Sequence, residues 1–182
     1  AVVPRSRVTV SGVGPDAGRV GILRVMDRMG GGLHLHNERV EGGEPVADIE
    51  LRYGPLRGTS LDADEVPSII DELPVLAVIA TQAEGTTEVR GAAELRVKET
   101  DRIATTVDEL RRMGARIEAL PDGFLVEGPT RLHGAHVGSH DDHRLAMSLA
   151  VAALAASGET TIEDTACLDD SFPGFRHALA VL

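Results

Sequence analysis

The sequence predicts an α/β protein in which some of the helices are buried inside the fold. Segments with helical hydrophobic periodicity alternate along the 182-residue chain with short segments rich in β-branched residues. Two of the helical segments are apolar on nearly every face, and a helix of that kind has to be buried. Because amphipathic and buried helices recur at a spacing of roughly 75 to 85 residues, we expect a loose structural repeat in one compact domain.

The amphipathic helices are expected at residues 22–29 and 103–113, where apolar side chains recur three and four positions apart. Both segments end in Arg-Met-Gly, so a basic side chain occupies the last turn and Gly30 or Gly114 follows it. Glycine is common just beyond a helix because it adopts the left-handed conformation without steric cost. These features predict that each helix ends at its glycine and leads into a short strand.

The buried helices are expected at residues 71–83 and 142–156, which begin with acidic residues and continue with apolar ones. Pro74 is compatible with the first turn of the earlier helix. A glycine-containing turn and a β-branched strand follow each helix. Residues 164–182 would begin a further copy of the repeat, and we expect the strand at residues 7–10 to complete it.

Composition and charge disfavour several classes of protein. Hydrophobic residues make up 42% and charged residues 26% of the chain, as in ordinary globular proteins. The formal net charge of −11 disfavours a broad surface for nucleic acid or anionic membranes, and no apolar run reaches the length of a membrane span. Cys167 is the one cysteine, which fits a reducing compartment. We expect a cytoplasmic protein with no nucleic-acid or membrane partner.

The segment Arg96–Arg102, with the sequence Arg-Val-Lys-Glu-Thr-Asp-Arg, carries charge on five of its seven residues and leads into an expected helix. Its acidic residues fit a helix N-terminus, where Glu99 or Thr100 could be the cap. Its two arginines and its lysine do not fit, because cations lie unfavourably beside the positive end of a helix dipole. A bound anion would compensate for them. A solvated surface loop is the alternative for this segment taken alone.

Two further charged clusters lie at the expected starts of the buried helices, so three helix N-termini could together form an anion site. Arginine is favoured for paired recognition of carboxylates and phosphates, which makes Arg102 and Arg144 the candidate anion-binding pair. Asp71 and Glu99 would be carboxylates held near these cations and suited to proton transfer. Histidines and acids at residues 140–143 could also suggest a metal site, but consecutive side chains point in different directions and disfavour it.

These residues resemble those of a known family. The segments Arg96–Arg102 and Asp142–Met147 are similar to the 5-enolpyruvylshikimate-3-phosphate (EPSP) synthase family, the 3-phosphoshikimate 1-carboxyvinyltransferases. Asp71–Ala77, Gly85–Thr87 and Phe172-Pro173 agree with that family in order and spacing. The resemblance covers essentially the whole chain, but it matches only the C-terminal portion of the family's length.

The resemblance implies an inside-out α/β barrel domain of the enolpyruvyl transferase type, in which pseudo-threefold βαβαββ repeats enclose buried parallel helices. Because family members have two domains, residues 1–182 are expected to be a single C-terminal globular domain, with the N-terminal portion absent. The family transfers the enolpyruvyl group of phosphoenolpyruvate to the 5-hydroxyl of shikimate 3-phosphate and releases phosphate. The reaction belongs to the shikimate pathway of aromatic amino acid biosynthesis and needs no metal or organic cofactor.

The same resemblance implies roles for individual residues. Asp71 would contact the shikimate hydroxyls and help to deprotonate the attacking one. Glu99 would be the acid/base partner at the phosphoenolpyruvate methylene, and Lys98 would favour its anionic form. Adding a proton to the alkene carbon creates a cationic centre, which two fixed carboxylates can stabilise. Which of the two carboxylates is acid and which is base in each step stays open.

The substrate-binding residues implied by the resemblance are Arg102, Arg144 and His143. The two arginines would hold the phosphoenolpyruvate carboxylate, and His143 would donate a nearby hydrogen bond. Asp170 stands where many members of the family have a lysine, so one phosphate contact would be missing or supplied by another residue.

The chain alone is therefore expected to be an inactive half-site whose partners are phosphoenolpyruvate, shikimate 3-phosphate and the missing N-terminal domain. A UDP-N-acetylglucosamine enolpyruvyl transferase domain is an alternative, since it shares the fold and the donor but lacks a Lys-Glu-Thr-Asp-Arg run of this kind. A non-catalytic anion-binding module is the alternative from another class.

Overall fold

The computed structural model describes residues 1–14 and 21–181. The strands are β1 Arg7–Val13, β2 Leu33–Glu41, β3 Glu44–Arg52, β4 Ser60–Leu61, β5 Gly85–Val89, β6 Arg116–Leu120, β7 Gly123–Gly128, β8 His136–Gly138 and β9 Thr161–Glu163. The α-helices are α1 Gly21–Arg28, α2 Leu73–Thr81, α3 Arg102–Arg112, α4 His143–Ala155, α5 Cys167–Ser171 and α6 Phe175–Ala180. The four expected helices are therefore confirmed, and α5 and α6 follow them.

The expected repeat is visible in the strand order of two sheets. The first sheet has the order β1-β3-β2, and the second sheet contains the order β5-β7-β6. In each case a strand leads into an amphipathic helix, α1 or α3, and an antiparallel hairpin follows that helix. The hairpin's second strand then pairs antiparallel with the strand before the helix. Each unit is thus a βαββ motif with the same pairing.

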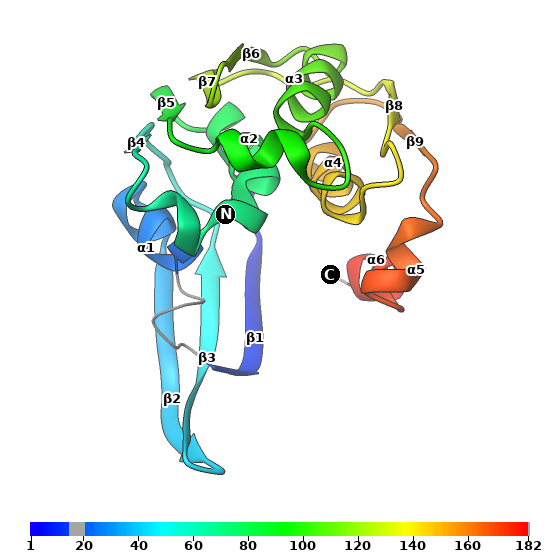
Figure 1. Cartoon of the computed structure of the whole chain (residues 1–182). Helices are drawn as coiled ribbons and strands as arrows, with labels where there is room; N and C mark the ends of the chain where they lie inside the picture. The colour runs from blue at the N-terminus through cyan, green and yellow to red at the C-terminus, as the bar shows by residue number, and fades with distance from the viewer. Residues whose placement is uncertain (15–20, 182) are drawn as a thin grey trace.

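The second sheet completes a longer unit. Strand β4 pairs parallel with β5 across α2, so β4 to β7 form one βαβαββ repeat. Strands β8 and β9 pair parallel across α4 in the same way and begin the next copy. The expectation that residues 7–10 complete a further copy beginning at residues 164–182 is wrong, because β1 pairs with β3 in the first sheet. Figure 1 shows that sheet extending away from α2, α3 and α4, and apart from α5 and α6.

The core is built on α2, and α4 packs against it. Eight of the nine residues of α2 are buried, which confirms the expectation of an enclosed helix. Helix α4 is buried through the side that contains Leu145, Leu149 and Ala152, whereas Leu154 remains half exposed. One apolar cluster continues from α1 through α2 and α3 to α4. The starts of α2, α3 and α4 are therefore held by a shared core.

The C-terminal ends of α1 and α3 are as expected, whereas the N-terminal cap of α3 differs from the expectation. Gly30 and Gly114 have φ values of 82° and 90°, the left-handed conformation expected after α1 and α3. The cap of α3 is Asp101, which accepts a hydrogen bond from the backbone N–H of Ala104, so neither Glu99 nor Thr100 is the cap. Asp71 makes no capping hydrogen bond at α2, and its side chain is free to pair with arginines.

No helix in residues 1–14 or 21–181 is long and apolar enough to cross a membrane. Residues 41–44 form the turn of the β2–β3 hairpin. Arg57 forms a parallel bridge with Glu84 shortly before β4 begins at Ser60.

Candidate functional site

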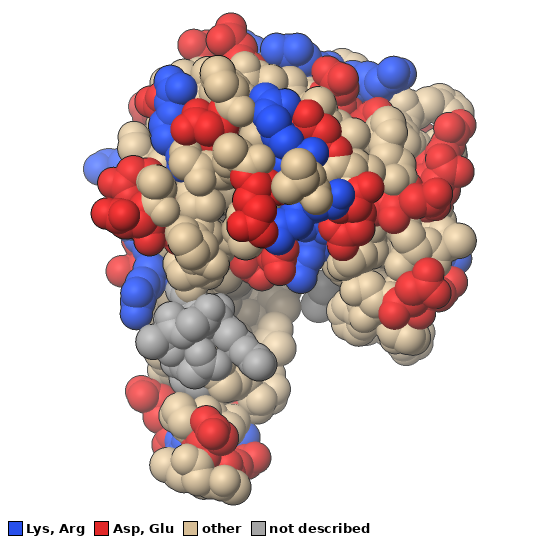
Figure 2. Space-filling model, viewed as in Figure 1, with Lys and Arg blue, Asp and Glu red and all other residues tan. Residues whose placement is uncertain are grey.

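Charged side chains gather where α2, α3 and α4 begin. Figure 2 shows basic and acidic side chains intermingled over the face that these helices occupy in Figure 1. A short 3-10 helix, Ile70–Glu72, precedes α2, and another, Ala93–Val97, lies before the start of α3. The fold therefore brings together segments whose contacting residues are 31 to 73 positions apart in sequence.

At the centre of this group lies a buried ion pair. Arg102 is 1% exposed and Asp142 is fully buried, although each is charged. The Nε and Nη2 atoms of Arg102 donate to the two carboxylate oxygens of Asp142 at 2.6 and 3.2 Å, in the two-pronged geometry that arginine favours. Asp142 also accepts hydrogen bonds from the backbone N–H groups of Arg144 and Leu145, so one carboxylate caps α4 and anchors α3.

The remaining donors of Arg102 hold two carboxylates at the surface. Its Nη2 atom donates to Glu99 at 2.6 Å, and its Nη1 atom donates to Asp71 at 3.4 Å. The side chains of Glu99 and Asp71 are 47% and 41% exposed, so they are open to solvent on the side away from the guanidinium. Arg102 thus fixes the two candidate acid/base groups relative to each other.

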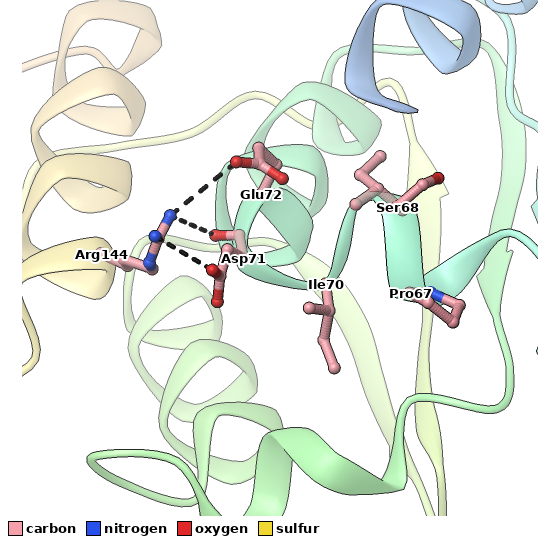
Figure 3. A pocket seen from close by; sticks show the side chains of 7 residues that line it. Pro67, Ser68, Ile70, Asp71, Glu72 and Arg144 are labelled. Carbon is pink, nitrogen blue, oxygen red and sulfur yellow. Dashed lines mark hydrogen bonds and ion pairs between the residues drawn. The ribbon is translucent and has the colours of Figure 1, made fainter. Parts of the chain in front are cut away.

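Arg144 reaches the same group from α4. Its Nη2 atom lies 3.1 Å from an Asp71 carboxylate oxygen, and its Nη1 atom donates to the Asp71 carbonyl at 3.3 Å and lies 3.8 Å from Glu72. Figure 3 shows this guanidinium directed at the two acids. Beside them is an open pocket of about 360 Å³, lined by Pro67, Ser68, Ile69, Ile70, Asp71, Glu72 and Arg144.

Two carboxyl groups of the site have shifted pKa values in opposite directions. Burial alone would raise the pKa of Asp142, but its hydrogen bond and attraction to Arg102 and its two backbone N–H donors outweigh burial and lower it. The pKa of Glu72 is raised, first by burial and then by repulsion from Asp71, against the attraction of Arg144. Asp142 is therefore a firmly anionic anchor, whereas Glu72 takes up a proton more readily.

The other two expected site residues lie at the edge of this arrangement. Lys98 pairs with Glu94 within its own segment, four residues away. His143 is the first residue of α4, partly buried, and its side chain makes no hydrogen bond within residues 1–14 and 21–181. The structure thus brings Asp71, Glu99, Arg102 and Arg144 into direct contact and leaves Lys98 and His143 beside them.

Two residues of the cluster, Asp142 and Glu72, are not among the site residues predicted from the sequence. Asp142 was read only as part of a motif, yet it is the main partner of Arg102. Glu72 was read as part of a charged helix start, yet it lines the pocket. A cap-type acid directly before a buried helix was the available signal for Asp142. His140 binds Glu109 at 2.8 Å while Asp142 binds Arg102, so neighbours in residues 140–143 do point to different partners.

The chain is similar to known proteins over nearly its whole length. The family model for EPSP synthase (3-phosphoshikimate 1-carboxyvinyltransferase) matches residues 1–179. A 3-phosphoshikimate 1-carboxyvinyltransferase of Herpetosiphon aurantiacus is 52% identical over 96% of the chain and 41% of its own length. The protein of the same name from Gloeobacter violaceus is 50% identical over 99% of the chain and 42% of its own length.

A solved structure gives the same result for the fold. The structure of EPSP synthase from Acinetobacter baumannii superposes with a TM-score of 0.94 and 40% sequence identity, over 100% of the chain and 42% of that protein. This likeness confirms the expected inside-out α/β fold. The chain spans about two fifths of the length of the curated relatives that it matches.

Proposed function

The chain belongs to the EPSP synthase family, and we propose that it supplies one side of the active site of a 3-phosphoshikimate 1-carboxyvinyltransferase. The proposed reaction transfers the enolpyruvyl group of phosphoenolpyruvate to the 5-hydroxyl of shikimate 3-phosphate. Because the chain covers about 42% of its relatives' length, we expect the rest of that length to supply the other side of the cleft. We expect no turnover by the chain alone.

One observation carries the proposal: Asp71 and Glu99 both contact the buried guanidinium of Arg102, and Arg144 pairs with Asp71, where three helix starts meet. Two exposed carboxylates and an arginine that is 32% exposed face the same region, and Asp71 and Arg144 also line the pocket. Such a group can bind an anionic substrate and exchange protons with it.

The proposed chemistry has two stages. The 5-hydroxyl oxygen adds to C2 of phosphoenolpyruvate, its proton passes to a carboxylate, and a second proton is delivered to the methylene carbon. The tetrahedral adduct then loses a proton from its new methyl group and expels phosphate, which restores the double bond. Each stage needs one group that accepts a proton and one that donates it, and Asp71 and Glu99 are the proposed pair.

The burial of Arg102 refines its proposed role. Asp142 and Glu99 occupy Nε and Nη2 with short hydrogen bonds, whereas Asp71 contacts Nη1 at 3.4 Å. A substrate carboxylate would therefore meet Arg102 at Nη1, in place of its weakest contact. Arg144 is the more accessible of the two arginines and is the proposed primary contact for the phosphoenolpyruvate carboxylate.

The supporting roles are proposals of the same kind. His143 would donate to a substrate oxygen from the first turn of α4, and Lys98 would raise the local positive potential beside Glu99. We also propose that residues 1–182 act as a single unit, of which residues 15–20 and 182 lie outside the described part. The shikimate acceptor is favoured over UDP-N-acetylglucosamine because the matched relatives carry the name 3-phosphoshikimate 1-carboxyvinyltransferase. A cytoplasmic location stays a prediction.

The decisive test is Glu99→Gln in a protein of the relatives' full length that contains this chain. Turnover with both substrates should fall by about 100- to 10,000-fold, the range typical of losing one acid/base group. The melting temperature should change little, because the Glu99 side chain is half exposed. Phosphate release and the formation of the enolpyruvyl product are the measurements.

Glu118→Gln, an exposed carboxylate on β6, is the matched control and should leave turnover unchanged. If the unsubstituted full-length protein shows no transfer with these two substrates, the proposed function is wrong. If it shows transfer that Glu99→Gln does not reduce, the assignment of Glu99 is wrong and the acid/base roles belong to other residues.

A further inference from the structure

Glu109 on α3 is a buried carboxylate that the proposed reaction does not use. It is 4% exposed, and both of its oxygens are engaged. One accepts a hydrogen bond from the backbone N–H of Gly138 at 3.1 Å, and the other lies 2.8 Å from Nε2 of His140. Arg112 approaches from the surface at 3.4 Å. Two of the three partners are thus the last residue of β8 and a residue of the segment that connects β8 to α4.

That segment is a turn with an unfavourable backbone. His140 and Asp141 have φ values of 54° and 57°, and the N–H of Asp142 donates to the carbonyl of Ser139 at 3.0 Å. Two successive residues with positive φ are typical of a type I′ turn, which favours glycine and asparagine. Positive φ is uncommon for residues other than glycine, although aspartate and histidine adopt it more often than most, so contacts with the rest of the fold help to hold this turn.

The turn is fixed from two sides. The hydroxyl of Ser139 donates to the carbonyl of Asp164 at 2.7 Å, and the N–H of Ser139 donates to the carbonyl of Glu163 at 3.2 Å. On the opposite side, His140 and Gly138 are attached to Glu109 of α3. The contact with Glu109 is a second connection between the turn and the helix that carries Arg102, in addition to the pair of Asp142 with Arg102.

The residue that leaves this turn is Asp142, the buried partner of Arg102. Both carboxylate oxygens of Asp142 accept hydrogen bonds from Arg102, and one of them also caps α4. A small displacement of the turn would therefore break one of these contacts. Since Arg102 in turn holds Glu99 and Asp71, the displacement would also reach the two proposed acid/base groups.

We propose that Glu109 and His140 are positioning residues, which hold the turn at residues 139–142 so that Asp142 stays in register with Arg102. They touch no substrate. Their effect on catalysis rests on the proposed function, whereas their effect on the turn does not. The contacts of Glu109 link α3 to the turn, which leads into α4. Figure 1 shows α3 beside β8 and α4.

Amide hydrogen exchange tests directly whether Glu109 and His140 hold the turn. The substitutions are His140→Gly, which removes the imidazole and relieves the backbone, and Glu109→Gln, which removes the charge and keeps the shape. Both should increase amide exchange in peptides covering residues 139–145 on the order of tenfold, the factor expected for losing one charge-assisted hydrogen bond. Exchange in α2 should stay as in the unsubstituted protein.

Arg112→Ala is the matched control, because it removes a partner of Glu109 that does not belong to the turn. Exchange in residues 139–145 should be unchanged in this variant. If exchange in His140→Gly equals that of the unsubstituted protein, the backbone alone defines the turn and the proposal is wrong. An equal increase in Arg112→Ala would also overturn it, because a general loosening of α3 would then be the cause.

Kinetics separate positioning from stability alone. In the full-length protein, His140→Gly should lower kcat by about three- to tenfold, with a smaller change in KM for phosphoenolpyruvate. His140→Gln should recover part of the loss, because its amide N–H can replace the Nε2 contact with Glu109. If the unsubstituted protein shows no transfer, the proposed function is wrong, but the exchange result still shows whether Glu109 and His140 hold the turn. Faster exchange with unchanged kcat would refute the positioning role.

Discussion

Two ion clusters of this chain differ in which charge is buried: an acid in one and an arginine in the other. On the first sheet, Glu50 is the buried member, with a side chain 3% exposed, and its partners Arg7 and Arg52 are 65% and 50% exposed. At the helix starts the arginine is buried, with Arg102 at 1% exposure, while its partner Glu99 is 47% exposed. One cluster therefore presents cations to solvent and the other presents carboxylates.

The difference follows from the elements that carry the charges. On the sheet, Glu50 and its partners lie on one polar face of β1, β2 and β3, and Arg7 stands opposite Arg52 in register. The hydrogen bond from Arg7 lowers the pKa of Glu50 against the effect of its burial, and with the help of Arg52 the pKa reaches about 2. A cluster satisfied in this way stabilises a surface, whereas exposed carboxylates beside a pocket remain available for proton transfer.

The largest effect should come from Arg102→Met, which tests whether the helix-start cluster is held by its buried cation. Removing Arg102 leaves Asp142 as a buried carboxylate without its cation, which costs about 3 to 5 kcal/mol. The free energy of unfolding, measured with urea, should fall by that amount. Arg7→Met is the counterpart on the sheet and should cost about 1 kcal/mol or less, because Arg7 is exposed and Arg52 still pairs with the buried Glu50.

Equal losses for the two variants would erase the distinction between the clusters. A full-sized loss for Arg102→Met that is abolished by adding Asp142→Leu would sharpen it, since removing both charges removes the buried, unpaired group.

The next effect in size concerns Arg144, the arginine of the helix-start cluster that solvent reaches. Arg144→Met should weaken phosphoenolpyruvate binding by the full-length protein about 10- to 100-fold, as expected for losing hydrogen bonds to a charged group. Titration calorimetry measures the change. Stability should fall by less than for Arg102→Met, because the Arg144 side chain is 32% exposed.

Arg131→Met, an exposed arginine outside the cluster, is the control for Arg144 and should leave binding unchanged. Loss of binding in both variants would mean that the overall charge of the protein, rather than this site, governs the affinity.

Sequence reasoning predicted more of this molecule at the level of elements than at the level of pairs. The ends of α1 and α3 were predictable because Gly30 and Gly114 mark them chemically. Strand β3 was missed although Ala47, Ile49 and Leu51 alternate with charged residues, the pattern of a half-buried strand. The cap of α3 was misplaced by one or two residues because several neighbouring side chains can all cap a helix.

The pairing at the site was beyond local sequence. Arg102 was predicted to bind substrate, but nothing in its neighbourhood shows that Asp142, forty residues later, occupies its two-pronged face. The same holds for Glu109 and His140, whose link depends on how α3 packs beside the turn. Residue types predicted the candidate acid/base and anion-binding groups, and the packing of the helices decides which of them are exposed to solvent.

The smallest effect concerns pH and the sheet cluster. Because the pKa of Glu50 lies below its ordinary value of 4.5, its ionised form stabilises the fold at pH above 4.5, and this contribution disappears as the pH falls toward about 2. The difference in unfolding free energy between the unsubstituted protein and Glu50→Gln should thus be constant above pH 5 and shrink steadily below it. Acid titrations at fixed urea measure this difference. A difference that does not vary with pH would show that Glu50 acts through packing alone, and the contrast between the clusters would then rest on the helix starts only.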